Sequence, residues 1–403
     1  MGPYRQREGS FYTIKELWSP IQVSRSSNGN LTIENHYSFL NANECKFTWE
    51  LRQFPGPFDP ESDYTVLEAG MLDVPSISPG TSIDILFEPP VTAKESDALA
   101  VRVEDPEGRE LWTWVWELNE GEGTHDFSVD AENASRSKAV AMETDESVTV
   151  AVDDTMIEFD RRTGELAGVV REGDSFSVNG PRAATGSSTL RSLVHESIEG
   201  RLVITAEYEG ALRTVRWTVG TDGWLECDYE YQAEGPQAYL GVTFQYPETT
   251  VRSKRWLGKG PYRVWKNRLV GNRLEVWHND YNDTIAGYSG WEFPEFKGCF
   301  AGVQWMQLLT DEGTITLVPS NPDVFVQVLT PDQPPENLRG KTSVALPACG
   351  FALLDAIPPI GSKFKAAETT GPQGHLTEAK GLYSGSVKIR FAAPSSSERH
   401  IRN

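Results

Sequence analysis

The sequence has few cysteines, little positive charge and no long apolar run, and each shortage excludes a class of protein. Its four cysteines, Cys45, Cys227, Cys299 and Cys349, lie far apart without a C-x-x-C pair, so neither a zinc knuckle nor a redox dithiol is indicated. No apolar run approaches the roughly 20 residues of a membrane-spanning helix. Lys and Arg number 37 against 58 Asp and Glu, which gives a formal net charge of −21. Such a surface repels phosphate and anionic lipid, so we expect neither nucleic acid nor membrane partners.

Several short motifs are also missing. The six histidines show no H-x-x-x-H or similar spacing, so we expect no metal site. Neither a G-x-S-x-G nor a phosphate-binding P-loop occurs, and we expect no cofactor. The first residues carry charge but no apolar stretch follows them, so no secretory signal is visible, and we expect a soluble protein of unknown compartment.

The chain is instead rich in aromatic residues, with 12 Trp, and shows period-two alternation of apolar and polar residues. Such alternation predicts strands with one apolar face, which pack sheet on sheet. Residues 1–120 are predicted to form a small antiparallel β-sandwich, followed by a linker at 119–124. Residues 125–403 predict a large all-β domain, because sheets of many strands curl or split. The absence of α/β alternation argues against Rossmann and TIM-barrel folds.

Three local expectations refine this all-β class. Residues 8–15 look like a strand, and no convincing amphipathic helix is expected. Alternation after residue 31 includes Tyr37 and Phe39. The apolar segment 350–364 contains two prolines, which predict a buried, fixed loop that shapes a surface or a pocket wall rather than a strand.

The most unusual segment spans residues 255–268. Its Gly258, Gly260 and Pro261 are expected to break a strand, so that a loop at a sheet rim begins near residue 262. Aromatic rings beside amide and guanidinium groups suit a sugar, since rings stack on C–H groups while the polar groups bind hydroxyls. The candidate carbohydrate-binding residues of this segment are Tyr262, Trp265, Asn267 and Arg268. The alternative is that the tryptophan fills the core and the arginine is an ion-paired surface residue.

Two further aromatic and polar clusters follow, at residues 277–283 and 290–298. They add His278, Trp291, Glu292 and Glu295 as candidate carbohydrate-binding residues. A glycosidase needs two carboxylates about 5–10 Å apart. Acidic residues are available in both clusters, but with 58 in the chain such proximity carries little information, and we assign no catalytic residue.

These motifs resemble a known family. Residues 256–262 with Trp265-Lys266-Asn267-Arg268 resemble the G-x-G-P-x-E-x-Y-x-D-R signature in the C-terminal domain of β-galactosidases of glycoside hydrolase family 2. Residues 293–298 and 302–305 are similar to the P-x-E-N-G segment and the strand after it. Residues 157–166 resemble the start of the same domain, residues 12–21 the exit from the family's barrel, and residues 31–51 its fourth domain.

The chain departs from the family at several motif positions. Arg263 or Val264 replaces the acid after G-P-x, while Phe296 and Lys297 replace the Glu and Asn of P-x-E-N-G. The family's W-R-A-P-T-D-N-D stretch survives only at residues 181–185. The loop that presents a sugar-stacking Trp has no clear counterpart, and residues 371–373 are the candidate for its place.

The resemblance implies an N-terminal immunoglobulin-like β-sandwich followed by a large β-supersandwich like that of galactose mutarotases. In the family the two catalytic glutamates lie in a TIM barrel that precedes these domains. This sequence shows no pattern of such a barrel. The resemblance therefore implies a non-catalytic C-terminal portion or small subunit, inactive alone. Its implied partners are a galactoside-like carbohydrate and a chain that bears the barrel.

Two alternatives remain open at this stage. The aromatic loops around Trp265 and Trp291 would also suit a stand-alone carbohydrate-binding protein. A mutarotase-like epimerase needs a His acid and a carboxylate base facing one sugar, and His278 with Glu292 or Glu295 is the only arrangement that the sequence offers.

Overall fold

The computed structural model describes residues 7, 9–60, 63–118, 138–198, 200–282, 295–332, 344–362 and 364–394. This part of the chain is nearly all β, which confirms the predicted fold class. The chain divides into two compact units, of which the first comprises Met1–Gly123, Lys259–Pro261 and Val270–Trp277. The second comprises Thr124–Gly258, Tyr262–Leu269 and His278–Asn403. The predicted linker at 119–124 lies outside the described residues.

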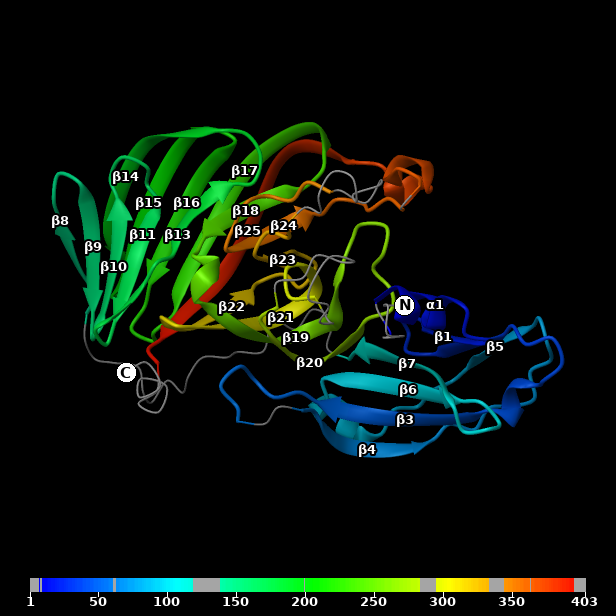
Figure 1. Cartoon of the computed structure of the whole chain (residues 1–403). Coiled ribbons are helices and arrows are strands. Elements are labelled where there is room, and N and C mark those ends of the chain that lie inside the picture. The colour runs from blue at the N-terminus through cyan, green and yellow to red at the C-terminus, as the bar shows by residue number, and fades with distance from the viewer. Residues whose placement is uncertain are drawn as a thin grey trace. The chain divides into compact units, whose positions relative to one another are not determined.

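The described residues of the first unit form one α-helix, two short 3-10 helices (Ala42–Glu44 and Val91–Glu95) and two antiparallel sheets (Figure 1). One sheet has the order β1-β2-β5 and the other the order β4-β3-β6-β7. Their bounds are α1 Gly9–Leu17, β1 Ile21–Arg25, β2 Leu31–Asn35, β3 Lys46–Gln53, β4 Thr65–Met71, β5 Ser82–Ile85, β6 Ala98–Glu104 and β7 Glu110–Glu117. No helix in the described part of the chain is long and apolar enough to cross a membrane.

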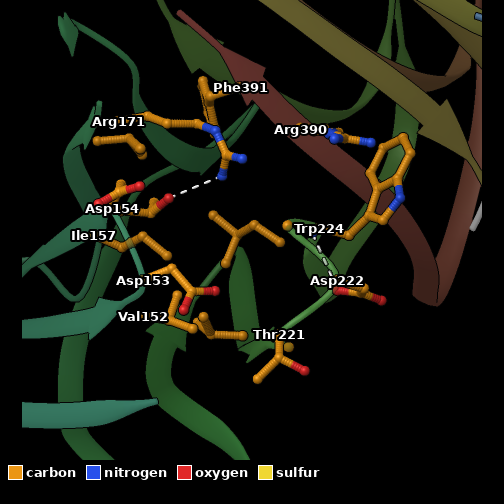
Figure 2. A pocket seen from close by; sticks show the side chains of 16 residues that line it. Val152, Asp153, Asp154, Ile157, Arg171, Thr221, Asp222, Trp224, Arg390 and Phe391 are labelled. Carbon is orange, nitrogen blue, oxygen red and sulfur yellow. Dashed lines mark hydrogen bonds between the residues drawn. The ribbon is translucent and has the colours of Figure 1, made fainter. Parts of the chain in front are cut away.

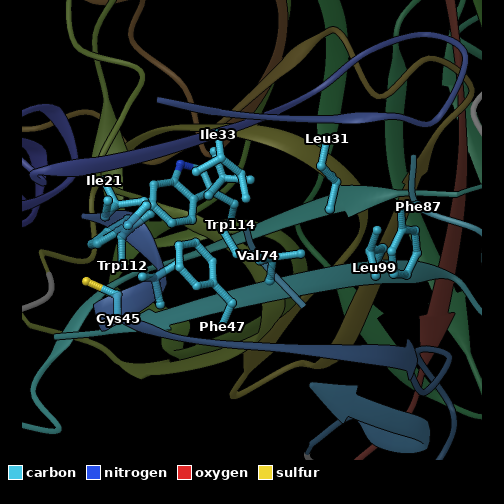
Figure 3. Close-up of a cluster of buried hydrophobic side chains, with 14 of the residues drawn as sticks. Ile21, Leu31, Ile33, Cys45, Phe47, Val74, Phe87, Leu99, Trp112 and Trp114 are labelled. Carbon is cyan, nitrogen blue, oxygen red and sulfur yellow. The ribbon is translucent and has the colours of Figure 1, made fainter. Parts of the chain in front are cut away.

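Both sheets of this unit face one hydrophobic core (Figure 3). On β2 the side chains alternate between buried and partly buried positions, with Leu31 and Ile33 inward, as period two requires. From the other sheet, Phe47, Leu99 and Trp112 enter the same cluster. One apolar cluster filled from two sheets is the packing of a β-sandwich.

Two sequence expectations for this unit are wrong. Residues 9–17 form helix α1 rather than a strand, and the Thr13 hydroxyl donates to the carbonyl of Gly9 within it. Alternation ends at Asn35, because this side chain donates to the carbonyls of Leu40 and Ile77 and accepts from the amide of Tyr37. The chain turns there, so that Tyr37 still packs against the core while Phe39 is 93% exposed.

The second unit is built on a large antiparallel sheet that closes on itself (Figure 1). Its longest pair joins β17 to β25, with Leu225 opposite Ile389 and Gln237 opposite Thr377. The first strands are β8 Val140–Glu143, β9 Ser147–Val152, β10 Thr155–Asp160, β11 Leu166–Arg171, β12 Asp174–Phe176, β13 Asn179–Ala183, β14 Ser188–Ile198, β15 Arg201–Gly210 and β16 Leu212–Val219. The sheet continues with β17 Leu225–Gln237, β18 Leu240–Gln245, β19 Val251–Val264, β20 Arg273–Asp280, β21 Gly298–Thr310, β22 Gly313–Pro319, β23 Phe325–Val328, β24 Phe351–Ala356 and β25 Thr377–Ala392. Of these strands, residues 259–261 of β19 and 273–277 of β20 are grouped with the first unit.

Aromatic rings connect the interior of this unit. The ring of Trp217 lies 5.9 Å from that of Phe159 and 6.2 Å from that of Phe244, which stacks on Phe351 at 4.7 Å. All four side chains are fully buried. An aromatic side chain buries more apolar area than other side chains do, and buried apolar area stabilises a fold. This row of rings is therefore a main source of stability in the unit.

Two predicted loops of this unit are partly strand. Strand β19 runs through Gly258, Gly260 and Pro261 without a break and ends only at Val264. At Gly258, an added Cβ would lie 3.0 Å from the carbonyl oxygen of Gly302, so the missing side chain permits close packing and does not end the strand. Likewise, residues 351–356 form β24, and only the part that follows is loop.

The four cysteines carry free thiols. Cys45, Cys227 and Cys299 are buried among apolar side chains, and Cys349 is half-buried. Burial raises the pKa of the Cys349 thiol to about 12. The cysteines therefore act as small apolar residues, as their scattered spacing indicates.

Candidate functional site

Three of the predicted site residues lie in one tight loop of the second unit. After β19, Trp265 and Arg268 exchange two backbone hydrogen bonds, of 3.1 and 2.8 Å, which close a turn around Lys266 and Asn267. Trp265 is only 5% exposed, so its ring belongs mainly to the interior, as the structural alternative predicted. Arg268 is half-buried.

Asn267 fastens this turn to the segment after β24. Its side-chain Nδ2 donates to the carbonyl of Ile360 at 2.8 Å, and its Oδ1 accepts from the amide of Ile360 at 2.9 Å. The backbone amide of Lys266 donates to the carbonyl of Pro358, while its Nζ donates to the carbonyl of His375. An amide that forms a paired contact with one backbone residue is held in one orientation.

We call residues 265–268, 357–362 and 366–376 the loop cluster. A cavity of about 570 Å³ lies in it, within the usual range of small-molecule sites. The cavity is lined by Ala238, Val344, Ala345, Pro358, Pro359, Gly361, Ala366, Ala367, Glu368, Gly374, His375 and Leu376. Because Pro358, Pro359 and Gly361 form part of its wall, the prediction that segment 350–364 shapes a pocket wall is confirmed for its C-terminal part.

The proline segment that forms this wall begins next to a small apolar core. Val264 from the end of β19, Cys299 from β21 and Leu354 from β24 pack with Ile357, all nearly fully buried. Beside it, the hydroxyl of Tyr231 donates to Asp355 Oδ2 at 2.5 Å. Burial raises the pKa of Asp355. These contacts fix the strand from which the proline segment leaves.

The lining of this cavity limits its chemistry. Glu368 and His375 are its ionisable side chains, and the remaining lining is apolar or backbone. Glycoside hydrolysis needs two carboxylates on opposite sides of the bond, and this lining supplies one. The arrangement can hold and orient a neutral ligand through apolar contact and a few hydrogen bonds.

Glu295 lies in an ion pair with Arg263, outside the lining of this cavity. Glu295 Oε2 lies 2.6 Å from Arg263 Nε, and both side chains are 9% exposed. The guanidinium also donates to the carbonyl of Lys297 and lies 5.4 Å from the centre of the Trp265 ring. Tyr262 is half-buried on β19. Glu295 is therefore placed as one half of a buried ion pair.

The other predicted residues are not brought into the loop cluster. His278 is 57% exposed and its Nε2 lies 3.0 Å from Asp280 Oδ1. Trp291 and Glu292 lie outside the described residues. The described part of the chain shows no contact between His278 and Glu295, so this pairing for a mutarotase-like reaction is not supported.

Sequence reasoning missed the two ionisable residues of the cavity. Glu368 lies within the short 3-10 helix Ala367–Thr369 and His375 follows the one at Pro372–Gly374, and neither residue belongs to a motif. The nearest signal was the glycine and proline content of residues 371–374. Within the described residues, no group of three or more His, Cys, Asp or Glu is arranged to hold a metal ion.

Part of this chain matches a known protein family. Residues 175–345 match the family model described as "Beta galactosidase small chain". The chain therefore contains a domain like that small chain, as the resemblance predicted. A search of curated proteins gives no match.

One solved structure, titled "Crystal Structure Analysis of HI1317", aligns over 63% of this chain and 100% of its own at 12% identity. Its TM-score of 0.33 is too low to support an inference.

Proposed function

We propose that this chain is a non-catalytic part or small subunit of a β-galactosidase-like glycoside hydrolase, where it shapes a sugar site and supports a barrel-bearing chain. The observation that carries the proposal is the small-chain match across residues 175–345. The loop cluster supports it, because its cavity offers a rigid apolar wall and only one carboxylate. A residue set of this kind can complete a pocket whose acids come from elsewhere.

The same proposal assigns a type to each domain and names a ligand. We assign residues 1–120 to an immunoglobulin-like domain and residues 125–403 to a supersandwich of the galactose mutarotase type. The two sheets with one shared core support the first assignment, and the large closed sheet supports the second. The proposed ligand is a galactoside, bound in the cavity of the loop cluster, whose proline wall Asn267 holds in place through its two hydrogen bonds to Ile360.

The test is hydrolysis of nitrophenyl β-galactoside by the chain alone and after mixing with the separately produced large chain of a two-chain β-galactosidase. We expect no turnover alone, turnover on mixing, and a complex on size exclusion. Turnover by the purified chain alone would overturn the non-catalytic assignment. Failure of the mixture to form a complex or gain activity would overturn the subunit role.

A matched pair of variants tests the cavity itself. Ala345 and Ala348 are both exposed and lie three residues apart, but only Ala345 lines the cavity. Ala345→Trp should fill the cavity and lower the activity gained on mixing, while Ala348→Trp should leave it unchanged. Equal effects of both variants would remove the cavity from the proposed site.

The stand-alone binding alternative predicts a different result. In that case galactoside titration of the chain alone would change Trp fluorescence, and mixing with the large chain would add nothing.

A further inference from the structure

A second cavity, of about 340 Å³, lies at one end of the large sheet in the second unit. It is formed by the turn between β9 and β10, the end of β11, the turn between β16 and β17, and the end of β25. None of its lining residues belongs to the loop cluster. Its volume lies at the small end of the range for ligand sites, about 300–1,000 Å³, and suits one sugar ring.

Two arginines converge on this cavity beside Gly223. An added Cβ at this glycine would lie 3.7 Å from Arg171 Nη1 and 3.8 Å from Arg390 Nε. The two guanidinium groups therefore face the same small space, which the missing side chain leaves open. Figure 2 shows the Arg171 side chain reaching into the cavity and Arg390 lying beside Trp224.

Arg171 and Arg390 have different neighbours. Arg171 Nη1 donates to the Thr155 hydroxyl at 2.9 Å, and its Nε lies 3.9 Å from Glu172, a side chain that is 54% exposed. Burial and the neighbouring Arg171 lower the pKa of Arg390, while Asp222 raises it. Two like charges in a partly buried site repel each other, and an anion between them removes that repulsion.

The rest of the lining is of two kinds. Phe391 and aliphatic side chains from β9, β10, β11 and β17 give the cavity an apolar side, and Trp224 contributes a ring. The turns carry Asp153 and Thr221, whose oxygens can bind hydroxyl groups. A ligand that uses all of these surfaces has a carboxylate or similar anion, an apolar ring face and several hydroxyls.

We propose that this cavity is a second carbohydrate site, which binds a hexuronate unit with its carboxylate between Arg171 and Arg390. Its ring lies along the apolar side and its hydroxyls reach Thr221 and Asp153. A guanidinium binds a planar carboxylate through two parallel hydrogen bonds, which gives orientation as well as affinity. Asp153, Asp154 and Asp222 also line the cavity, so the space between the two guanidinium groups is the part of the lining that favours a carboxylate.

The test is calorimetric titration of the full chain with methyl galacturonide, methyl galactoside and sodium sulfate at low ionic strength. We expect the galacturonide to bind at least about tenfold more tightly than the galactoside, since hydrogen bonds between charged groups are the stronger ones. Its affinity should fall as salt is added. Equal affinity for both sugars would overturn the proposal, and sulfate binding as tight as galacturonide binding would reduce the site to a simple anion site.

Variants locate the ligand within the molecule. Arg171→Gln and Arg390→Gln should each weaken galacturonide binding about tenfold or more, whereas Arg216→Gln, an exposed position on β16, should not change it. Unchanged affinity in both cavity variants would overturn the proposal. Because Arg390 is half-buried, circular dichroism should confirm that its variant is folded.

Asp153→Asn provides a test with the opposite sign. Asn tolerates the positive φ of 48° at this position, so the fold should persist. Removing a negative charge from the turn should strengthen galacturonide binding if the carboxylate lies in the cavity. Weaker galacturonide binding in this variant, together with unchanged binding in both arginine variants, would indicate a ligand held by Asp153 rather than by the arginines, and would overturn the assignment.

Discussion

At the residue scale, the unusual feature of this chain is a set of buried ionisable side chains in the second unit. Lys254 is fully buried, and its Nζ lies 4.0 Å from the ring centre of Phe296 and 4.2 Å from that of Phe300. It donates to Asn279 Oδ1 at 3.0 Å and to the carbonyl of Phe296. Burial, aided by the nearby Arg263, lowers the pKa of Lys254 well below 10.5, while Glu295 opposes this shift. The surroundings suit the neutral amine or a cation held by rings.

This lysine should give the protein a measurable pH dependence. Between its lowered folded-state pKa and 10.5, the unfolded chain binds the proton that the folded chain has released, so the free energy of unfolding rises with pH. Denaturant unfolding of wild type and Lys254→Met between pH 6 and 8.5 should show a rise that the variant lacks, at most about 1.4 kcal/mol per pH unit. This range avoids tyrosine ionisation, and the exposed Lys388→Met is the control.

Parallel curves for wild type and Lys254→Met would show that the lysine stays charged across this range.

The buried pair of Arg263 and Glu295 predicts strong coupling between the two side chains. Removing one member of a buried pair leaves the other charge uncompensated, so Glu295→Leu and Arg263→Met should each cost about 3–5 kcal/mol in the free energy of unfolding. The double variant should lose much less than the sum of the two. Urea unfolding of all four proteins measures this coupling. Additive losses would mean that Glu295 is not held as part of an ion pair, which would reopen its role in a sugar site.

At the scale of elements, the sequence could predict most strands but not where segments depart from their local preference. Strand β16 has one face made by Val215, Trp217 and Val219, so period two is visible in the letters. Helix α1 contains residues that favour strands, yet Glu16 Oε2 accepts from the amide of Gly271, which is 255 residues away. A contact of that kind overrides local preference and leaves no periodic signal.

The site shows the same limit. Composition and glycine or proline spacing pointed to the turn at Trp265 and Asn267 and to the proline segment. The pairing of Asn267 with Ile360, and the inclusion of His375 and Glu368 in one cavity, depend on long-range packing, which a single sequence does not encode in its neighbours.

Asn267 should control the rigidity of the loop cluster. Asn267→Asp keeps the acceptor for the Ile360 amide but replaces the donor to its carbonyl with a repelling oxygen. We expect hydrogen exchange of the Ile360 amide to speed up about tenfold or more, with a loss of about 1–3 kcal/mol locally. Exchange within β17 should not change, which is the internal control. Exchange at Ile360 equal to wild type would show that the backbone contact at Pro358 alone holds the turn.

At the scale of the whole molecule, excess negative charge competes with many local ion pairs. Most described pairs have at least one exposed side chain, and a fully exposed pair such as Arg191 with Glu209 is worth about 0–1 kcal/mol. The formal charge of −21 remains after all of them are formed. Added salt weakens both the attraction within ion pairs and the repulsion among the excess negative charges. The repulsion acts over longer distances than the contacts within a pair, so salt screens it more fully.

We therefore expect salt to stabilise this protein at neutral pH. Raising NaCl from 10 to 150 mM shortens the Debye length from about 30 to about 8 Å, which should raise the thermal midpoint by roughly 1–2 °C for each kcal/mol of repulsion removed. KCl at equal ionic strength should give the same shift, because screening does not depend on the cation. As the pH approaches the isoelectric point of about 4.8, the shift should shrink, since the net repulsion disappears. A midpoint that falls with salt at neutral pH would mean that the ion pairs outweigh the excess charge.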